Sequence, residues 1–366
     1  MPRQSNTSKP ENIDTDRRPF VLIWEVTQAC ELACKHCRAD AQRRRHPMEL
    51  STSEAMSLLD DIASFGKDQI LVLSGGDPLF RPDLFDILAD GRDIGLQMTL
   101  TPSGTSSLTP DVVKEIAKID VRRLALSLDG ASPTAHDAFR QEDGSFSSTM
   151  IAAEVAREHN LPLQINTTVC EETVDELPDV IDLVCELEAV LWSVFFLVPI
   201  GRGQALAPVS PERAESVMQW LLTACKERGL GIKTTEAPHY RRVALQSQHR
   251  QTDSPQPVTD SIGRRSGIGA GDGFAFISHT GEVFPSGFLP LSVGNVREQS
   301  IVDLYREAPL LQQLRDADLL RGKCGACEFR PLCGGSRSRA YATTGDPLAS
   351  DPLCPYLPTG STGQSE

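Results

Sequence analysis

The sequence contains no long hydrophobic run. No apolar stretch in its 366 residues approaches the roughly 20 residues that cross a bilayer, and the N-terminus lacks the apolar segment of a signal peptide. We therefore expect no membrane partner and a cytoplasmic location. Apolar residues still make up 40% of the chain, which is enough for a buried core, and the length is typical of about two domains.

The sequence also lacks an excess of basic residues. Lys and Arg number 36 against 50 Asp and Glu, which gives a formal net charge of −14 at pH 7. Nucleic-acid binding needs a basic face that neutralises phosphates, so we expect no nucleic-acid partner. Residues 1–18 are polar, charged and without hydrophobic periodicity, which predicts a disordered tail, and we expect a second such tail at 359–366.

Cysteine, in contrast, is abundant and clustered. Seven of the ten cysteines fall into two groups, which favours metal ligands in a reducing compartment over a disulfide framework. The first group is Cys30, Cys34 and Cys37, spaced C-x3-C-x2-C directly after the hydrophobic run 20–26. Three thiolates are one ligand short for a [4Fe–4S] cluster and leave one iron open, as catalytic metal sites do. The alternatives are a zinc site that lacks a ligand and three unrelated thiols.

The second cysteine group lies near the C-terminus. Its four members have the spacing C-x2-C-x5-C-x20-C and are Cys324, Cys327, Cys333 and Cys354. Four thiolates close a coordination shell, which suits a saturated [4Fe–4S] cluster or a structural zinc ion, and spacing alone does not separate these two. We expect Cys170, Cys185 and Cys225, which lie in or beside apolar segments, to be small buried hydrophobic residues.

Strand-like and helix-like segments alternate from residue 20 to about 229. The expected strands, each short and apolar, are 20–26, 69–73, 96–101, 123–128, 163–169 and 191–198. The expected helices are 52–65, 82–93, 110–118, 148–159, 174–188 and 211–228. Six β-α units predict an α/β fold with a parallel sheet and an active site at the carboxyl ends of its strands. The alternation fits an incomplete barrel and a doubly wound sheet equally well.

The remaining third of the chain has a different character. Residues 246–273 are rich in Gln, Ser, Pro and Gly, which predicts a linker or a mobile lid. Residues 274–278 and 282–284 flank His279-Thr280-Gly281 and predict a hairpin. A short helix near 301–315 then leads into the second cysteine group.

These features resemble the radical S-adenosylmethionine (SAM) enzymes over nearly the whole chain. The resemblance implies a partial (β/α)6 barrel at 19–230, a linker or lid at 231–273, and a SPASM/twitch-type iron–sulfur extension at 274–358. It also implies that Cys30, Cys34 and Cys37 hold a [4Fe–4S] cluster whose fourth iron binds SAM. Reductive cleavage of SAM would then give a 5′-deoxyadenosyl radical that abstracts a substrate hydrogen.

The resemblance also assigns SAM-binding residues. Gly75, Gly76 and Asp77 stand where the family has Gly-Gly-Glu and would bind the SAM amino group, whereas alone the paired glycines indicate only a turn. Gly201, after the sixth strand, would contact the adenine through its backbone. His36 occupies a position that is usually aromatic in the family and would pack against the adenine.

Two expected strands and a later arginine supply further candidates. Ser127, Asp129 and Asn166 match positions that contact ribose or the SAM carboxylate, and Arg140 matches a family arginine that would pair with a carboxylate. The alternatives are an Asx turn at Asp129, a satisfied buried amide at Asn166 and a surface salt bridge at Arg140. Residues 101–105 replace the family's Thr-Asn-Gly without its Asn, so we assign no contact there.

For the second cysteine group the resemblance favours one auxiliary [4Fe–4S] cluster over zinc. Ser286 stands where relatives place the first ligand of a further auxiliary cluster, and Ser336 stands where the nearest branch often has Cys. That branch includes alternative haem-biosynthesis enzymes, which act on tetrapyrrole side chains.

We therefore expect an anionic substrate and a cytosolic electron donor such as flavodoxin or ferredoxin. Six arginines could pair with substrate carboxylates or could be solvated surface charges; they are Arg241, Arg242, Arg264, Arg265, Arg337 and Arg339. The alternative functions are a radical SAM maturase of ribosomal peptides and a non-catalytic iron–sulfur electron carrier or sensor.

Overall fold

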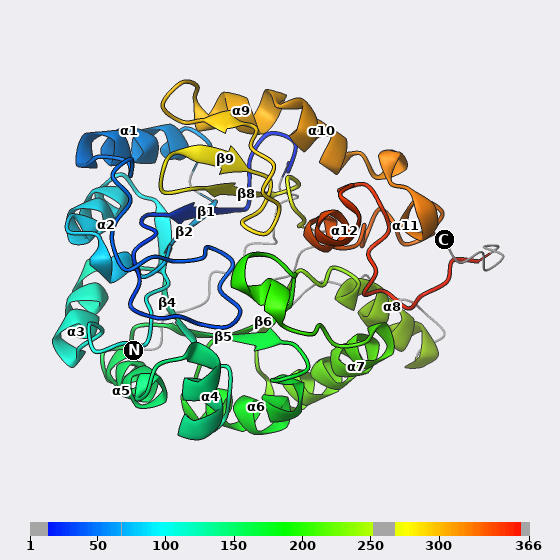
Figure 1. The fold of residues 1–366 in the computed structure, drawn as a ribbon, viewed down its shortest axis with the longest axis horizontal. Coiled ribbons are helices and arrows are strands. Elements are labelled where there is room, and N and C mark those ends of the chain that lie inside the picture. Colours follow the sequence, from blue (N-terminus) through cyan, green and yellow to red (C-terminus); the bar gives the residue numbers. More distant parts are fainter. Residues whose placement is uncertain (1–13, 67, 252–267, 360–366) are drawn as a thin grey trace.

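One sheet organises the whole chain. The computed structural model describes residues 14–66, 68–251 and 268–359. Within them, ten strands form a sheet in the order β10-β9-β8-β1-β2-β3-β4-β5-β6-β7. All neighbouring pairs from β8 to β7 are parallel, and only the β8-β9 and β9-β10 pairs are antiparallel. The helices from α1 to α7 follow one another around the outside of the strands, as Figure 1 shows.

The six predicted β-α units are confirmed. Their strands are β1 (Val21–Glu25), β2 (Ile70–Ser74), β3 (Gln97–Leu100), β4 (Arg123–Ser127), β5 (Leu163–Val169) and β6 (Leu191–Phe196). The predicted helices are α1 (Thr52–Ala63), α2 (Leu84–Asp93), α3 (Pro110–Ile119), α5 (Ser145–Glu158), α6 (Leu177–Glu186) and α7 (Pro211–Arg228). Ser51 caps α1 in a reciprocal capping box with Glu54. Trp24 of β1 and Trp192 of β6 are completely buried between the sheet and these helices.

Several elements escaped the sequence reading. The short helix α4 (Pro133–Arg140) precedes α5, and strand β7 (Ile232–Thr235) extends the sheet beyond β6. Helix α8 (Tyr240–Gln251) occupies the start of the segment predicted as a linker or lid. Residues 252–267 of that segment lie outside the described residues.

The C-terminal third continues the same sheet. The predicted hairpin is present as β8 (Phe274–Ile277) and β9 (Glu282–Phe284), followed by the short strand β10 (Gly294–Asn295). β8 pairs in parallel with β1, so it lies beside the first strand of the barrel. The predicted helix at 301–315 is two helices, α9 (Ile301–Glu307) and α10 (Pro309–Arg315). They separate at Pro309 because proline cannot donate to the preceding turn.

The second cysteine group lies on the last short elements. A 3₁₀ turn (Ala317–Leu319) leads into α11 (Gly322–Gly325), and α12 (Arg337–Thr344) follows. In Figure 1 these elements lie beside α8. Among the described residues, no helix has both the length and the apolar character that crossing a membrane would require.

A buried arginine secures the end of β1. The Arg81 side chain donates to the carbonyl oxygens of Val26 and Leu50 at 3.0 and 2.9 Å and pairs with Asp83. Its guanidinium also lies 5.3 Å from the ring centre of Trp24. The chain therefore leaves β1 in a defined direction.

We predict that Arg81→Ala lowers the free energy of unfolding by about 3 kcal/mol, because two buried carbonyls and the Asp83 carboxylate lose their partner. Urea unfolding followed by circular dichroism measures the change. Arg92→Ala, which removes an exposed arginine from α2, is the control and should change stability by less than about 0.5 kcal/mol. Equal effects of the two substitutions would contradict this account.

Candidate active site

The loop with the first three cysteines leaves the carboxyl end of β1. The Cys30 amide donates to the Gln42 carbonyl at 2.8 Å, and the Gln42 amide donates back to Gln28 at 3.1 Å, so the loop closes on itself. The Lys35 amide donates to the carbonyl of Phe139 at the end of α4, also at 3.1 Å. The loop is thus held both by its own ends and by a neighbouring helix.

Paired glycines bring the loop after β2 against the residues that precede Cys30. The amides of Gly76 and Asp77 donate to the carbonyls of Thr27 and Ala29 at 2.9 and 2.7 Å. A Cβ at Gly75 would lie 2.4 Å from the Thr27 oxygen, and one at Gly76 would lie 2.3 Å from the Ala29 oxygen. The close approach that these glycines allow is therefore to the chain itself.

Gly201 has the same role on the other side of the loop. Its φ of 53° is in the left-handed region, and a Cβ there would lie 2.5 Å from the Cys37 oxygen. The next residue, Arg202, donates from its amide to Cys37 and from its Nε to the Cys34 carbonyl, each at 3.0 Å. The cysteine loop consequently lies between the turns that follow β2 and β6.

The three thiols of this loop lie in a poorly solvated site. Cys30 and Cys34 are buried and Cys37 is half-buried. Burial raises the pKa of Cys30 to about 11 and also raises the pKa of Cys34. Thiolates here therefore require a compensating cation, as a metal centre provides.

Ser103, after β3, is a contact that sequence reasoning missed. Its hydroxyl lies 3.6 Å from the Cys30 sulfur and donates to the Gly76 carbonyl at 3.3 Å. We assigned no contact to residues 101–105 because the family's asparagine is absent. The serine two residues after Thr101 was the available signal.

Asp77 combines full burial with an unpaired oxygen. Its Oδ1 accepts from the amides of Leu79 and Ser103 at 3.1 and 3.4 Å. Its Oδ2 is buried and has no hydrogen-bond partner among the described residues. Burial raises the pKa of the Asp77 carboxyl to about 6. The Thr105 side chain acts in the opposite sense and lowers the pKa of this carboxyl, and Oδ2 has room to accept a further donor.

Asp129 and Arg140 pair with each other. Arg140 Nη1 lies 3.3 Å from Asp129 Oδ2, and Asp129 Oδ1 accepts from the Thr168 amide at 2.7 Å. Both side chains are buried, so the pair is not the surface salt bridge considered from sequence, and the Asp129 oxygens bond to Thr168 and Arg140 instead of forming an Asx turn. Each Asp129 oxygen has one protein donor and can accept a second, so its contact with ribose stays a prediction.

Arg140 also contacts the residue before the third cysteine. Its Nη1 lies 3.4 Å from His36 Nε2, and the His36 ring stacks on Phe139 at 4.8 Å between ring centres. Burial lowers the pKa of His36 to about 4, so the ring is neutral near pH 7.

Ser127 and Asn166 lie opposite each other on β4 and β5. They are partners in the parallel register, and both are half-buried. Asn166 Oδ1 accepts from Gln164 at 2.8 Å. The pair therefore places a hydroxyl and an amide side by side toward the carboxyl ends of the two strands.

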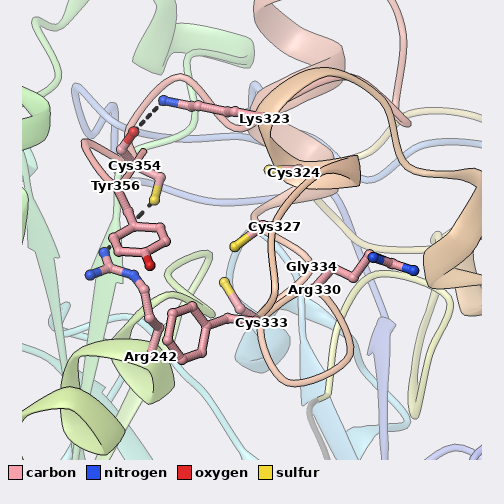
Figure 2. Close-up of a pocket in the computed structure, with 11 residues that line it drawn as sticks. Arg242, Lys323, Cys324, Cys327, Arg330, Cys333, Gly334, Cys354 and Tyr356 are labelled. Carbon is pink, nitrogen blue, oxygen red and sulfur yellow. Dashed lines mark hydrogen bonds between the residues drawn. The ribbon is translucent and has the colours of Figure 1, made fainter. Parts of the chain in front are cut away.

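The four cysteines of the second group line one pocket. In Figure 2, the sulfurs of Cys327 and Cys333 project into the pocket from one side and that of Cys354 from the other. Burial raises the pKa of Cys327, Cys333 and Cys354. Cys324 is buried on α11, and its sulfur accepts from the Asp351 amide at 3.4 Å. Gly335 allows this packing, since a Cβ there would lie 3.1 Å from the Cys324 sulfur.

The described residues contain no group of three or more His, Cys, Asp or Glu side chains that could hold a single metal ion. A mononuclear zinc site would bring its sulfurs to about 2.3 Å from one ion. Ligands that belong to different irons of a cluster stand further apart.

Six arginines were expected either to pair with substrate carboxylates or to be solvated surface charges. Three of them do neither. Arg242, Arg337 and Arg339 are buried and bonded within the protein, so they are neither solvated nor available to substrate carboxylates. Arg339 pairs with Asp351 at 3.1 Å and donates to main-chain oxygens at the ends of β6 and β7. Arg264 and Arg265 lie outside the described residues, and Arg241 is half-buried on α8.

The two serines at expected cysteine positions meet at one carboxylate. Ser286 donates to Glu236 Oε1 at 3.2 Å, and Ser336 donates to its Oε2. Ser338 donates to Oε1 at 2.9 Å. All three serines are buried.

A further buried network at the end of β1 was not foreseen. Glu25 binds Arg38 at 2.9 Å and His279 at 2.7 Å, and Arg38 lies over the Phe276 ring of β8. The available signal was the acidic residue Glu25 inside an otherwise apolar strand.

Comparisons with known proteins agree with this geometry. The radical SAM superfamily profile matches residues 24–184. An AdoMet-dependent heme synthase of Methanosarcina barkeri is 42% identical over 93% of this chain and 97% of its own length. A protein of the same name from Nitratidesulfovibrio vulgaris is 38% identical over 93% of this chain and 94% of its own length.

A solved structure shares the fold. Streptococcus suis SuiB bound to S-adenosylmethionine has a TM-score of 0.73 at 16% identity and matches 93% of this chain and 78% of its own. The fold is thus a partial radical SAM barrel with a SPASM-type extension.

We predict that Gly76→Ala displaces the first cysteine loop, because the new Cβ would overlap the Ala29 carbonyl. Anaerobically reconstituted variant protein should lose about half of the iron bound by the wild type, if the first group holds one of two clusters. Iron analysis measures the loss. Gly269→Ala, where a Cβ meets nothing within 4 Å, is the matched control and should bind iron normally. Full iron in Gly76→Ala would show that the contact is dispensable.

Proposed function

The chain belongs to the radical SAM superfamily, and from this premise we propose that it is a SAM-dependent haem synthase that oxidatively modifies or decarboxylates the side chains of a tetrapyrrole. One observation carries the proposal. The similarity to heme synthases extends over 93% of the chain and is not confined to the barrel. As a radical SAM enzyme, the protein uses a [4Fe–4S] cluster and SAM.

Cys30, Cys34 and Cys37 hold this cluster in our proposal. Their fit rests on burial, because thiols with raised pKa values become thiolates only beside a cation. The cluster, when it has bound SAM, supplies the electron that generates the radical which removes a substrate hydrogen. The surrounding residues determine where this cluster would lie. The turns at Gly76 and Gly201 hold the first cysteine loop in position, and Ser103 lies beside the Cys30 sulfur.

SAM is held, we propose, by residues at the carboxyl ends of the strands. The unpaired Oδ2 of Asp77 is suited to accept from the SAM amino group. Ser127, Asp129 and Asn166 offer polar groups for the ribose, and Asp129 also orients Arg140. Neutral His36, held against Phe139, offers a flat ring for the adenine, and the turn at Gly201 borders the same loop.

The second group holds one auxiliary [4Fe–4S] cluster in this proposal. The similarity to radical SAM proteins over 93% of the chain, including its C-terminal segment, favours a cluster over zinc. Ser286, which stands at the position of a first ligand of a further cluster, donates to Glu236, as does Ser336. One auxiliary cluster is therefore the better account.

The substrate is proposed to be anionic, and a flavodoxin or ferredoxin is proposed as electron donor. The burial of Arg242, Arg337 and Arg339 removes them from direct recognition of substrate carboxylates. The site for these carboxylates must therefore use other groups near the barrel mouth.

The activity test uses an iron porphyrin with propionate side chains. Reduced wild-type protein with SAM should release 5′-deoxyadenosine and convert the porphyrin into a product that has lost carbon dioxide. Chromatography and mass spectrometry detect both products. Cys34→Ala should abolish both, because two thiolates cannot hold the cluster. Cys333→Ala should leave some SAM cleavage without porphyrin product.

Cys185→Ala is the control, since this half-buried cysteine on α6 belongs to neither group and should leave activity intact. SAM cleavage without any porphyrin change, together with modification of a peptide, would favour a peptide maturase. Absence of cleavage under all conditions would leave only an iron–sulfur carrier or sensor.

We predict that SAM affinity depends on the protonation of Asp77. The carboxyl must be ionised to bind an ammonium group, so affinity should fall as pH decreases from 7 to 5, by about tenfold per pH unit below a pKa of about 6. Anaerobic equilibrium dialysis measures the dissociation constant, and visible absorption verifies that the cluster is retained. Asp77→Asn should bind SAM weakly without this pH dependence, and exposed Asp93→Asn should behave like the wild type. A flat profile in the wild type would contradict the role of Asp77.

A further inference from the structure

Two buried arginines donate to sulfurs of the second cysteine group. Arg337 Nη2 lies 3.7 Å from Cys324 Sγ, and Arg242 Nη2 lies 3.7 Å from Cys354 Sγ. Arg337 is 5% exposed and Arg242 is 2% exposed, so solvent does little to screen either charge. The sulfurs of this pocket thus have cationic donors on two sides.

The two arginines differ in what else they bind. Arg242 forms an ion pair with Glu215, donates to Gln246 at 2.9 Å and lies over the Tyr356 ring. Figure 2 shows its guanidinium next to Cys354. Because Glu215 supplies a full negative charge, the Arg242–Glu215 pair is nearly neutral as seen from the pocket.

Arg337 has no such carboxylate. Its Nε donates to the Gly335 carbonyl at 3.2 Å, and its Nη1 donates to the carbonyls of Pro347 and Ala349 at 2.9 and 2.7 Å. Among the described residues, no carboxylate lies within ion-pair distance of Arg337. The Asp351 carboxylate pairs with Arg339 instead. A buried cation bonded only to neutral carbonyls is unfavourable unless an anion is near. The Cys324 sulfur is the group in contact that can carry that charge.

We propose that Arg337 raises the reduction potential of the cluster held by the second cysteine group, and that Arg242 positions Cys354 with little effect on that potential. This inference rests on the proposed auxiliary cluster. On reduction the cluster takes one electron from the reductant and gains one negative charge. A nearby uncompensated cation stabilises the reduced form, whereas a neutralised ion pair does so far less.

The first cysteine group lacks an equivalent contact. The contacts of the Cys30 sulfur within hydrogen-bond distance are the neutral Ser103 hydroxyl and the Leu32 amide. Two arginines lie near this group, and each has a carboxylate partner: Arg140 pairs with Asp129, and Arg202, whose Nε donates to the Cys34 carbonyl, lies 3.3 Å from Asp40. The second cluster should therefore be the more readily reduced of the two. This difference favours the second cluster as an acceptor of electrons and the first as their donor to SAM.

The test is a redox titration of the full-length, anaerobically reconstituted protein followed by electron paramagnetic resonance. Addition of SAM identifies the signal of the first cluster, which serves as an internal reference. In Arg337→Gln, the ratio of reduced to oxidised second cluster at a fixed potential should fall about tenfold, which is about 59 mV for one electron. The first cluster should be unchanged.

Three further variants separate charge from structure. Arg337→Lys keeps the charge and should stay within about threefold of the wild-type ratio, as should Arg242→Gln. Arg330→Gln is the matched control, because Arg330 lines the same pocket but points away from the cysteines in Figure 2 and pairs with Asp318. It should leave both potentials unchanged.

Each result has a definite consequence. A wild-type potential in loaded Arg337→Gln, or an equal shift in Arg330→Gln, would overturn the inference. If Arg337→Gln does not load the second cluster, Arg337→Lys decides: a wild-type potential supports the inference, and a tenfold fall overturns it. Wild-type protein with about four irons instead of about eight would refute the auxiliary cluster itself, before any variant is compared.

Discussion

The placement of the first cysteine loop is the constraint on which the rest of the site depends. Between β1 and α1 the loop has no regular secondary structure of its own, so its geometry comes from neighbours. The turn after β2 binds the residues before Cys30, the end of α4 binds Lys35, and the turn after β6 binds Cys37. All of these segments follow parallel strands, whose carboxyl ends meet at one edge. The sheet therefore brings together the cysteines and the residues proposed to bind SAM.

Much of the fold was predictable because the central strands are buried on both faces. Such strands are continuous apolar runs, and β1 to β6 were all located within a few residues. The edge strand β7 has only one buried residue in four and gave no such signal. The choice of β1 as partner for β8 is a long-range contact that local pattern does not encode. The last residues of α8, from Gln246 on, were predicted as a linker because their composition is polar.

The site was predictable from sequence where its chemistry depends on the spacing of residues along the chain. It was not predictable where the role of a side chain depends on which other side chains contact it in the fold. The two cysteine groups follow from their spacing, although their ligand roles stay proposals. The sequence identified Arg140 and Asp129 separately but did not indicate that each satisfies the other. Likewise, a run of arginines near cysteines gives no information on burial. Arg337 and Arg339 are buried because the segment 345–354 folds back over them.

The end of β6, which supports the first cysteine loop, also anchors the second cysteine group, together with the end of β7. Arg339 donates to the carbonyls of Phe196 and Leu197 after β6 and to Glu236 after β7, while Asp351 neutralises its charge. Glu236 in turn accepts from serines before and within α12 and at the end of the β8-β9 hairpin. Because removing one partner of a buried ion pair is strongly unfavourable, these contacts hold the C-terminal segment firmly against the barrel. The polar groups around Glu236 thus join the segment that carries the second cysteine group to the strands whose ends support the first.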